Sequence, residues 1–147
     1  MRIVHRLCAE SRDLRLERMR PRPLALSLVL IAVTMISGLA VRFVPLGLPS
    51  AAAKYGGSML WALMIYWIVS TALSATRISS VAQLTVAITI SVELFKKYHS
   101  PSLDAFRLTL PGILLLGRYF SMWDIAAYLL AIAIGVFADR KMRSIEK

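Results

Sequence analysis

The chain has 147 residues and a formal net charge of +10, and 58% of its residues are hydrophobic. Its mean hydropathy of +0.66 is too high for a soluble globular protein of one domain's length. The composition therefore predicts an integral membrane protein. No binding module and no basic patch interleaved with aromatic residues accompanies the charge, which argues against nucleic acid as a partner. The one cysteine, Cys8, excludes an intrachain disulfide framework.

Four apolar runs divide the chain, at about residues 24–41, 57–75, 78–95 and 122–138. Crossing the hydrocarbon core of a bilayer takes about 20 helical residues, with about 17 as a minimum. Three runs meet this length and the last is borderline. Because backbone amides in lipid must bond within their own segment, each run predicts a helix. The expected fold is an all-α integral membrane protein, a four-helix transmembrane bundle over residues 23–140.

A shorter apolar stretch, residues 108–117, lies between the third and fourth runs. Pro111 and Gly112 interrupt it, and it is too short to span the bilayer. The sequence therefore predicts a short interfacial or re-entrant segment between the third and fourth helices.

Lysine and arginine are distributed unequally around the four runs. Twelve lie before the first run, at Arg77 between the second and third, or after the fourth, and six lie in the remaining loops. Because cytoplasmic segments collect these residues, we expect both termini in the cytoplasm, with residues 1–22 and 141–147 as tails. Met19 is an alternative start that would shorten the first tail. The net charge then reflects topology and contact with the bilayer's anionic lipid headgroups.

Two sets of residues in the runs predict helix packing. Ala127, Ala131 and Gly135 recur every four residues in the last run, a pattern that lets helix backbones approach closely and that could join copies into a homo-oligomer. Tyr66 and Trp67 lie deep in the second run and need partners for their polar atoms. We expect them to pack against neighbouring helices.

An acid ends the third run. Thr85, Thr89, Glu93 and Lys97 recur every four residues and share one helix face. An acid within a membrane segment is a functional hypothesis by default, because burying its charge is costly. Lys97, one turn after Glu93, could pair with it and fix the helix end. Both interpretations stay open: a structural ion pair, or an acid that handles protons or binds a ligand.

A second acid opens the fourth run. Ser121 stands three residues before Asp124, an arrangement that caps a helix start, and a negative charge suits the positive end of the helix dipole. Capping alone would explain Asp124, although it does not exclude a functional role.

The remaining charged residues of this region complete two candidate groups. The ligand-binding candidates are Asp104, Arg107 and Arg118. The candidates for acid–base catalysis are Glu93, Asp124 and His99. Arginine forks suit carboxylate or phosphate recognition, and carboxyl and imidazole groups can exchange protons. His99, close to Pro101, is also typical of a turn. The spacing matches no metal-ligand signature and no nucleophile motif, so neither a metal nor another cofactor is expected.

One spacing in the last third of the chain is recognisable. Its positions are Glu93, Arg118, Ser121, Asp124 and Gly135. This spacing resembles the VanZ-like family of small bacterial membrane proteins, whose association with teicoplanin resistance implies action at the cell envelope. The chain departs from that family at Lys96, Tyr128 and Ala131, where the family has glutamine, asparagine and glycine.

A wider pattern covers most of residues 24–138. It comprises a Glu-Leu-x-x-x-Tyr-His-x-Pro-x-Leu-Asp-Ala-x-Arg run at 93–107, a helix start at 120–128, and Leu60 to Leu63 followed by Tyr66. This pattern resembles a VanZ-related family of four-span bacterial membrane proteins defined only as a domain of unknown function. The resemblance implies a multi-pass protein of the bacterial inner (plasma) membrane and assigns no reaction.

Three functional hypotheses follow. In the first, the five charged residues Glu93, Asp104, Arg107, Arg118 and Asp124 converge on an extracytoplasmic site that binds or processes an anionic lipid-linked or glycopeptide-like ligand. The second is a small proton-coupled transporter subunit, because four short helices with one membrane acid are typical of dimeric multidrug exporters. Those exporters carry their acid in the first span, which here is free of charge. The third is a non-catalytic scaffold in an envelope complex.

Overall fold

The computed structural model describes residues 22–45, 47–109, 111–112 and 120–145. Its labelled elements are all helices: α2 (Leu24–Phe43), α3 (Ser50–Ala72), α4 (Ile78–Phe95), α5 (Pro101–Arg107) and α7 (Met122–Ile145). The all-α prediction is therefore confirmed. Cys8, Met19 and most of the stretch 108–117 lie outside the described residues, as does Arg118.

Three of these helices are long and apolar enough to cross a membrane: α2, α4 and residues Met122–Arg143 of α7. The prediction of several membrane spans is confirmed to that extent. Helix α3 has 23 residues and a length of about 34 Å at the usual helical rise. It does not meet the same criterion of apolarity, since its glycine, serine, tyrosine and tryptophan residues lower its hydropathy.

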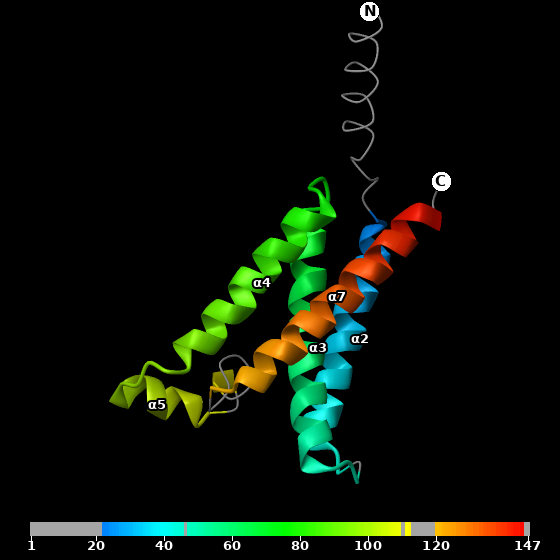
Figure 1. Cartoon of the computed structure of the whole chain (residues 1–147). Helices are drawn as coiled ribbons and strands as arrows, with labels where there is room; N and C mark the ends of the chain where they lie inside the picture. Colours follow the sequence, from blue (N-terminus) through cyan, green and yellow to red (C-terminus); the bar gives the residue numbers. More distant parts are fainter. Residues whose placement is uncertain (1–21, 46, 110, 113–119, 146–147) are drawn as a thin grey trace, which may run out of the picture.

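The four long helices alternate in direction, and α3 occupies the centre (Figure 1). It contacts α2, α4 and α7, and α4 also contacts α7. Helix α4 is inclined away from α3, and the short α5 lies beyond its end (Figure 1). Helices α3 and α7 run in the same direction, and the start of α7 lies beside the third turn of α3, where Ser58 donates to Asp124 (Figure 1).

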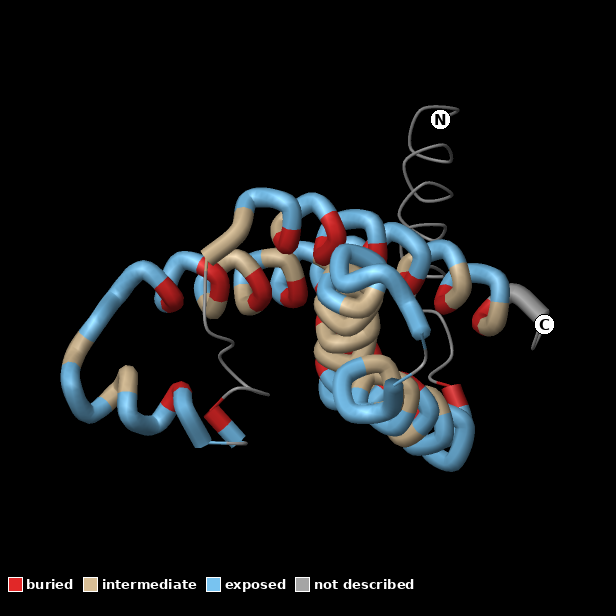
Figure 2. Tube along the Cα trace, turned by 90° about the horizontal axis from the view of Figure 1, so that it is seen from below, coloured by how far each residue is buried: buried red, intermediate tan, exposed pale blue. Residues whose placement is uncertain are grey.

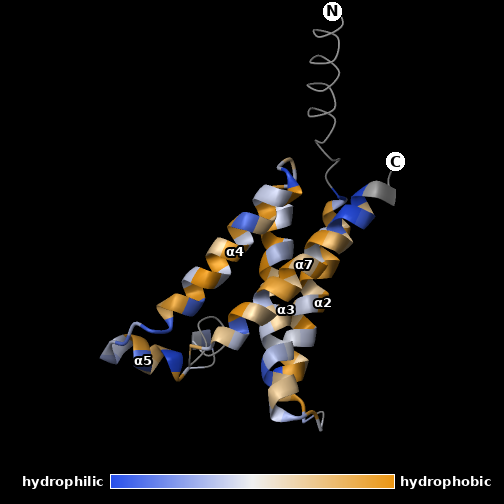
Figure 3. Cartoon of the chain, in the orientation of Figure 1, coloured by the Kyte–Doolittle hydropathy of each residue, from blue (hydrophilic) through white to orange (hydrophobic). Residues whose placement is uncertain are grey.

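The polarity of the bundle is inverted relative to a soluble protein. In α2 the two buried residues are Ser27 and Thr34, whereas large apolar side chains such as Leu28 and Ile36 are exposed. Buried positions recur turn by turn along the helices (Figure 2). The exposed surface of α2 is largely apolar, whereas that of α4 mixes apolar residues with serines and a glutamine (Figure 3). A protein with apolar residues outside and hydroxyls inside suits a lipid environment.

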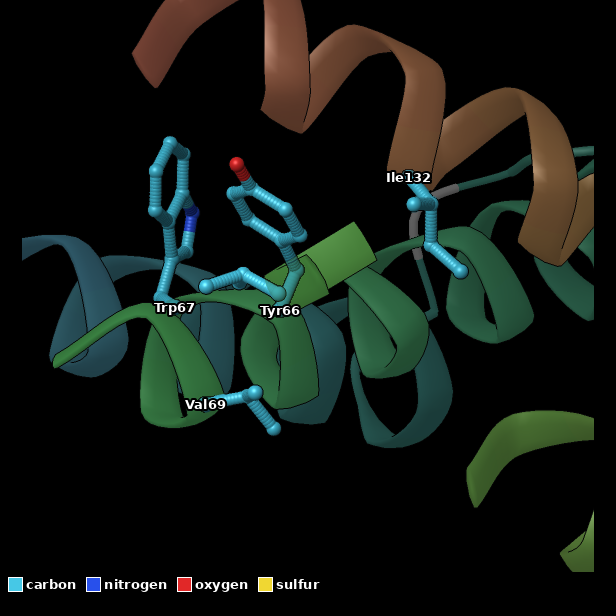
Figure 4. Close-up of a cluster of buried hydrophobic side chains, with 5 residues drawn as sticks. Tyr66, Trp67, Val69 and Ile132 are labelled. Atoms are coloured by element: carbon cyan, nitrogen blue, oxygen red, sulfur yellow. The ribbon is translucent and has the colours of Figure 1, made fainter. Parts of the chain in front are cut away.

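The apolar core lies between α3, α4 and α7. Its larger cluster contains Tyr66, Trp67, Val69, Val81 and Ile132. Figure 4 shows the Tyr66 ring rising from α3 with its hydroxyl directed at α7, while Val69 points the opposite way. The expectation that Tyr66 and Trp67 pack between helices is confirmed.

The small residues of α7 allow it to pack closely against α3. Ala127, Ala131 and Gly135 are all buried. A Cβ atom added at Gly135 would lie 2.9 Å from Cδ1 of Tyr66 and 3.1 Å from Cδ1 of Leu63. Since this contact accounts for the spacing within one chain, the spacing itself no longer indicates a homo-oligomer.

Helix α5 was not expected from the sequence, although its start carries ordinary signals. Ser100 accepts a hydrogen bond from the Leu103 amide at 3.3 Å, and Pro101 occupies the first helical position. Both are typical of helix N-termini. The helix has only seven residues, which is too short for hydrophobic periodicity to indicate it.

Candidate functional site

A polar cluster forms where the end of α4 meets the starts of α3 and α7. We call it the Glu93 cluster, and its members are Ser58, Glu93, Lys96, Asp124 and Tyr128. Glu93 ends the buried face of α4 that Val81, Thr85 and Thr89 begin. Both threonine hydroxyls donate to carbonyls of their own helix, so they leave the carboxylate to other donors.

The Glu93 carboxylate is fully buried and well satisfied. Its Oε2 accepts a hydrogen bond from the Tyr128 hydroxyl at 2.8 Å and forms an ion pair with Nζ of Lys96. Its Oε1 accepts from the backbone amide of Ser121 at 2.8 Å. Three donors from two segments therefore hold this side chain in place, as a buried carboxylate requires.

The partner of Glu93 is Lys96, and the prediction of Lys97 was wrong. Helix α4 ends at Phe95, so the chain turns before Lys97 can continue the helical face. Instead, Nζ of Lys97 lies 4.3 Å from the centre of the Phe120 ring. Lys96 is buried, whereas Lys97 is exposed.

Asp124 belongs to the same cluster. It is buried, its Oδ2 lies 3.9 Å from Nζ of Lys96, and its Oδ1 accepts a hydrogen bond from the Ser58 hydroxyl at 3.4 Å. Its backbone amide donates to the Ser121 carbonyl at 3.1 Å. Glu93 and Asp124 thus approach one shared ammonium group, and the Asp124 carboxylate contacts α3 as well as its own helix start.

The charges of the Glu93 cluster do not balance. Its buried charges are two carboxylates and one ammonium group, and the exposed ammonium group of Lys54 acts on Asp124 from outside the cluster. Lys96 is within ion-pair distance of both acids, but its contact with Asp124 is the longer one. Burying an excess charge is expensive, and the cost falls when a proton or a cation binds.

Asp104 and Arg107 form a separate group at α5. The Arg107 side chain is only 4% exposed, and its guanidinium donates to the Phe95 carbonyl at 2.8 Å and to the Tyr98 carbonyl at 2.9 Å. It also donates to Asp104 at 3.0 Å. Arg107 therefore holds α5 against the last residue of α4 and the turn that follows it. Nδ1 of His99 lies 3.2 Å from Asp104, but its side chain is 65% exposed.

A second buried polar cluster lies at the opposite end of α3 and α7. We call it the Asp139 cluster, and its members are Arg22, Tyr66, Ser70, Asp139 and Arg143. Asp139 accepts hydrogen bonds from Tyr66 at 3.1 Å and Ser70 at 2.9 Å. Nε of Arg143 lies 2.9 Å from Oδ1 of Asp139, and Nε of Arg22 lies 3.2 Å from the same oxygen.

Arg22 connects the segment before α2 to this cluster. Its guanidinium donates to Ser70 at 2.9 Å and lies 4.7 Å from the centre of the Trp67 ring. Burial lowers the pKa of Arg22 from its ordinary value, and the Asp139 carboxylate partly opposes that shift. Two guanidinium groups face one carboxylate, so the Asp139 cluster carries an excess positive charge.

Sequence reasoning missed the Asp139 cluster, because its two arginines were counted only as topology signals and Asp139 was not singled out. Spacing could have found it: Asp139 and Arg143 stand four residues apart, as do Tyr66 and Ser70. Lys96 and Tyr128 were also missed as site residues, although both are positions where the chain departs from the VanZ-like pattern. Among the described residues, no group of three His, Cys, Asp or Glu side chains could hold a metal ion.

Residues 47–132 match DUF2809, a family described as proteins of unknown function. This range includes all of the Glu93 cluster but not Arg22, Asp139 or Arg143. No curated protein and no solved structure matches the chain. The expectation of a domain of unknown function is confirmed, while the link to VanZ-like proteins stays a prediction. The match covers more than half of the sequence, and the chain therefore belongs to the DUF2809 family.

Proposed function

We propose that this chain is a four-span protein of the bacterial inner membrane with both termini in the cytoplasm. The central position of α3 supports a fourth span, because α3 is as long as its neighbours and runs opposite to α2 and α4. The excess of lysine and arginine near the termini supports the orientation. The resemblance to VanZ-like proteins supports a location at the cell envelope.

Labelling of introduced cysteines tests this topology. In a Cys8→Ser background, Ser50→Cys lies at the start of α3 and Thr76→Cys lies after its end. If α3 spans the membrane, a membrane-impermeant maleimide added to intact cells labels Ser50→Cys, and Thr76→Cys reacts only after the cells are opened. Equal labelling of both positions from one side would mean that α3 does not cross the bilayer.

For the activity, we propose that the Glu93 cluster binds a proton and exchanges it for a cationic ligand, as in a small proton-coupled transporter or one of its subunits. The observation that supports this proposal most is the charge imbalance among the buried side chains, two carboxylates against one ammonium group. Because the excess negative charge is costly in a membrane, a proton or a cationic group stabilises the site. Tyr128 and Ser58 supply hydroxyls beside the two acids, which suits proton exchange.

A proton-release assay tests this activity. Purified protein in weakly buffered solution would receive tetraphenylphosphonium as a cationic probe, and a pH indicator would report the protons released. We expect about one proton per chain, since one negative charge is in excess. Glu93→Gln and Asp124→Asn should abolish the release, whereas Asp104→Asn, an acid outside the cluster, should leave it unchanged.

Infrared spectroscopy gives an independent test of the same proton. A protonated carboxyl group in the cluster would give a carbonyl band that shifts in D₂O. This band should disappear in Asp124→Asn or Glu93→Gln and persist in Asp104→Asn. A spectrum with no band from either acid, together with no proton release, would contradict the proposal.

An anionic envelope ligand is the second candidate function. Lys54 and Lys97 are exposed at the end of the bundle that contains the Glu93 cluster, and the resemblance to VanZ-like proteins favours such a ligand. The geometry supports it less, because Lys96 and Arg107 are already paired with acids of this chain. Alanine substitution of Glu93 and Asp124 separates this role from a structural one when both membrane abundance and an envelope-stress phenotype are measured.

A further inference from the structure

A small pocket lies beside the Asp139 cluster, between the start of α2 and the end of α3. Its volume is about 120 Å³, several times the space that one water molecule needs. The residues that line it are Arg22, Leu24, Ser27, Ser70, Thr71 and Ser74. One cation, four hydroxyls and one leucine therefore surround a space that could hold a small polar group.

Arg22 lines this pocket and has one side-chain nitrogen without a hydrogen-bond partner in the part of the chain that the structure describes. Its side chain is 2% exposed, its Nε pairs with Asp139 and its Nη2 donates to Ser70. Its Nη1 is buried and has no hydrogen-bond partner among the described residues. A buried cationic N–H group without a partner is costly, and a bound acceptor would remove that cost.

The electrostatics of the pocket favour an anion. Arg22 and Arg143 together exceed the charge of Asp139 by one positive unit. The pocket also lies at the N-terminus of α2, whose cap residue Pro23 offers no side-chain hydrogen bond and whose first turn contains no acid. Unsatisfied amides at a helix start add partial positive charge. A ligand with one negative charge would neutralise the excess.

We propose that this pocket binds a phosphate group, with an anionic phospholipid headgroup as its source. The pocket lies at the end of a candidate membrane span, the depth at which headgroups are found. Next to it, Leu24 is 64% exposed and Leu28 is 55% exposed, so acyl chains would have an apolar surface to lie on. This site is separate from the Glu93 cluster and does not depend on the function proposed there.

Lipid binding to the purified full-length chain tests the proposal. Native mass spectrometry would compare phosphatidylglycerol with phosphatidylcholine and diacylglycerol of the same acyl chains. We expect phosphatidylglycerol to bind about tenfold tighter than phosphatidylcholine, the size of one charge-assisted hydrogen bond, and diacylglycerol to bind weakest.

Three variants assign the effect to the pocket. Arg22→Gln removes the cation but also breaks the ion pair with Asp139. Ser27→Leu and Thr71→Leu fill the pocket from opposite walls and leave that ion pair intact. We expect all three to lose the preference for phosphatidylglycerol. Ser80→Leu, an exposed position at the start of α4, is the matched control and should keep it.

Inorganic phosphate identifies the source. If phosphate alone stabilises the wild type against heat and displaces phosphatidylglycerol, the site takes a free phosphate group. If phosphate has no effect while phosphatidylglycerol stabilises, the ligand is the lipid. Equal binding of the three lipids by the wild type would overturn the proposal, as would an undiminished preference in folded Ser27→Leu and Thr71→Leu.

Discussion

The Glu93 and Asp139 clusters are built alike and balanced oppositely. Each buries one carboxylate completely and satisfies it with a tyrosine hydroxyl, from Tyr128 in one case and Tyr66 in the other. Asp139 faces two guanidinium groups, whereas Glu93 and Asp124 share one ammonium group. Both clusters therefore bury a carboxylate beside a tyrosine, but the Asp139 cluster has an excess positive charge and the Glu93 cluster an excess negative charge.

This difference separates what each cluster is suited to do. Guanidinium groups stay charged at any physiological pH, so the Asp139 cluster can relieve its excess only by binding an anion. Carboxyl groups can take up a proton, so the Glu93 cluster can change its own charge. The first cluster is suited to a permanent anchor, and the second to a reversible exchange.

The largest effect is expected from Asp139→Leu. This change leaves two buried guanidinium groups without their carboxylate, and breaking a buried pair from one side costs about 3–5 kcal/mol. The free energy of unfolding, measured in mixed detergent and SDS, should fall by that amount, and membrane abundance should fall with it. Unchanged stability would mean that Arg22 and Arg143 do not depend on Asp139, and would break the comparison.

Lys96→Gln should have the next largest effect. Glu93 would keep its bonds to Tyr128 and to the Ser121 amide, so we expect a loss of about 2–3 kcal/mol, below the value for a complete loss of partners. Lys97→Gln, at the exposed neighbour, should change the free energy of unfolding by less than about 0.5 kcal/mol. Equal effects of the two changes would refute the assignment of Lys96 as the partner.

A partial rescue would sharpen the result for Lys96. In the double variant Glu93→Gln/Lys96→Gln, no ammonium and one acid fewer remain, so part of the lost stability should return. The coupling between the two positions, read from the same unfolding curves, would then measure the ion pair. Additive losses would show that Glu93 and Lys96 act independently.

Gly135→Ala tests the apolar contact that separates the two clusters. Its Cβ would come within 2.9 Å of the Tyr66 ring, and overpacking of this kind costs about 1–3 kcal/mol. Gly56→Ala is the matched control, because a Cβ there meets nothing within 4 Å. Stability should fall for Gly135→Ala only, and equal stability of the two variants would contradict the close approach of α3 and α7.

The smallest effect is expected from His99→Ala. Its ring is largely exposed, and its polar partner among the described residues is the half-buried Asp104. We expect a change in unfolding free energy within about 0.5 kcal/mol and unchanged proton release. Loss of proton release with normal stability would restore His99 as a catalytic candidate and extend the Glu93 cluster toward α5.

Hydropathy was enough to predict the helical class and most helix positions. The boundaries of α4 agree with the prediction, while α7 continues past residue 138 to Ile145. Hydropathy could not reveal this extension, because Asp139 and Arg143 are polar and stay in the helix through their mutual ion pair. For the same reason hydropathy missed the first seven residues of α3, which begins at Ser50 although its apolar run begins at residue 57.

The candidate sites were harder to predict than the helices. Glu93 and Asp124 could be identified because acids in apolar surroundings are rare, and they do share one cluster. Lys96 could not be chosen over Lys97 from spacing, since the choice depends on where α4 ends. The pairing of Arg22 with Asp139 joins residues more than a hundred positions apart, and no local pattern in the sequence records it.

The side chains of α3 that face α7 have a mechanical consequence. Ser58, Ala62, Tyr66 and Ser70 recur every four residues, and the first and last of them bond to Asp124 and Asp139. These two attachments are about 18 Å apart along the axis. A single attachment would allow α3 to rotate against α7, whereas two attachments along the axis restrict both rotation and sliding. These two attachments favour movement of α3 and α7 as one unit.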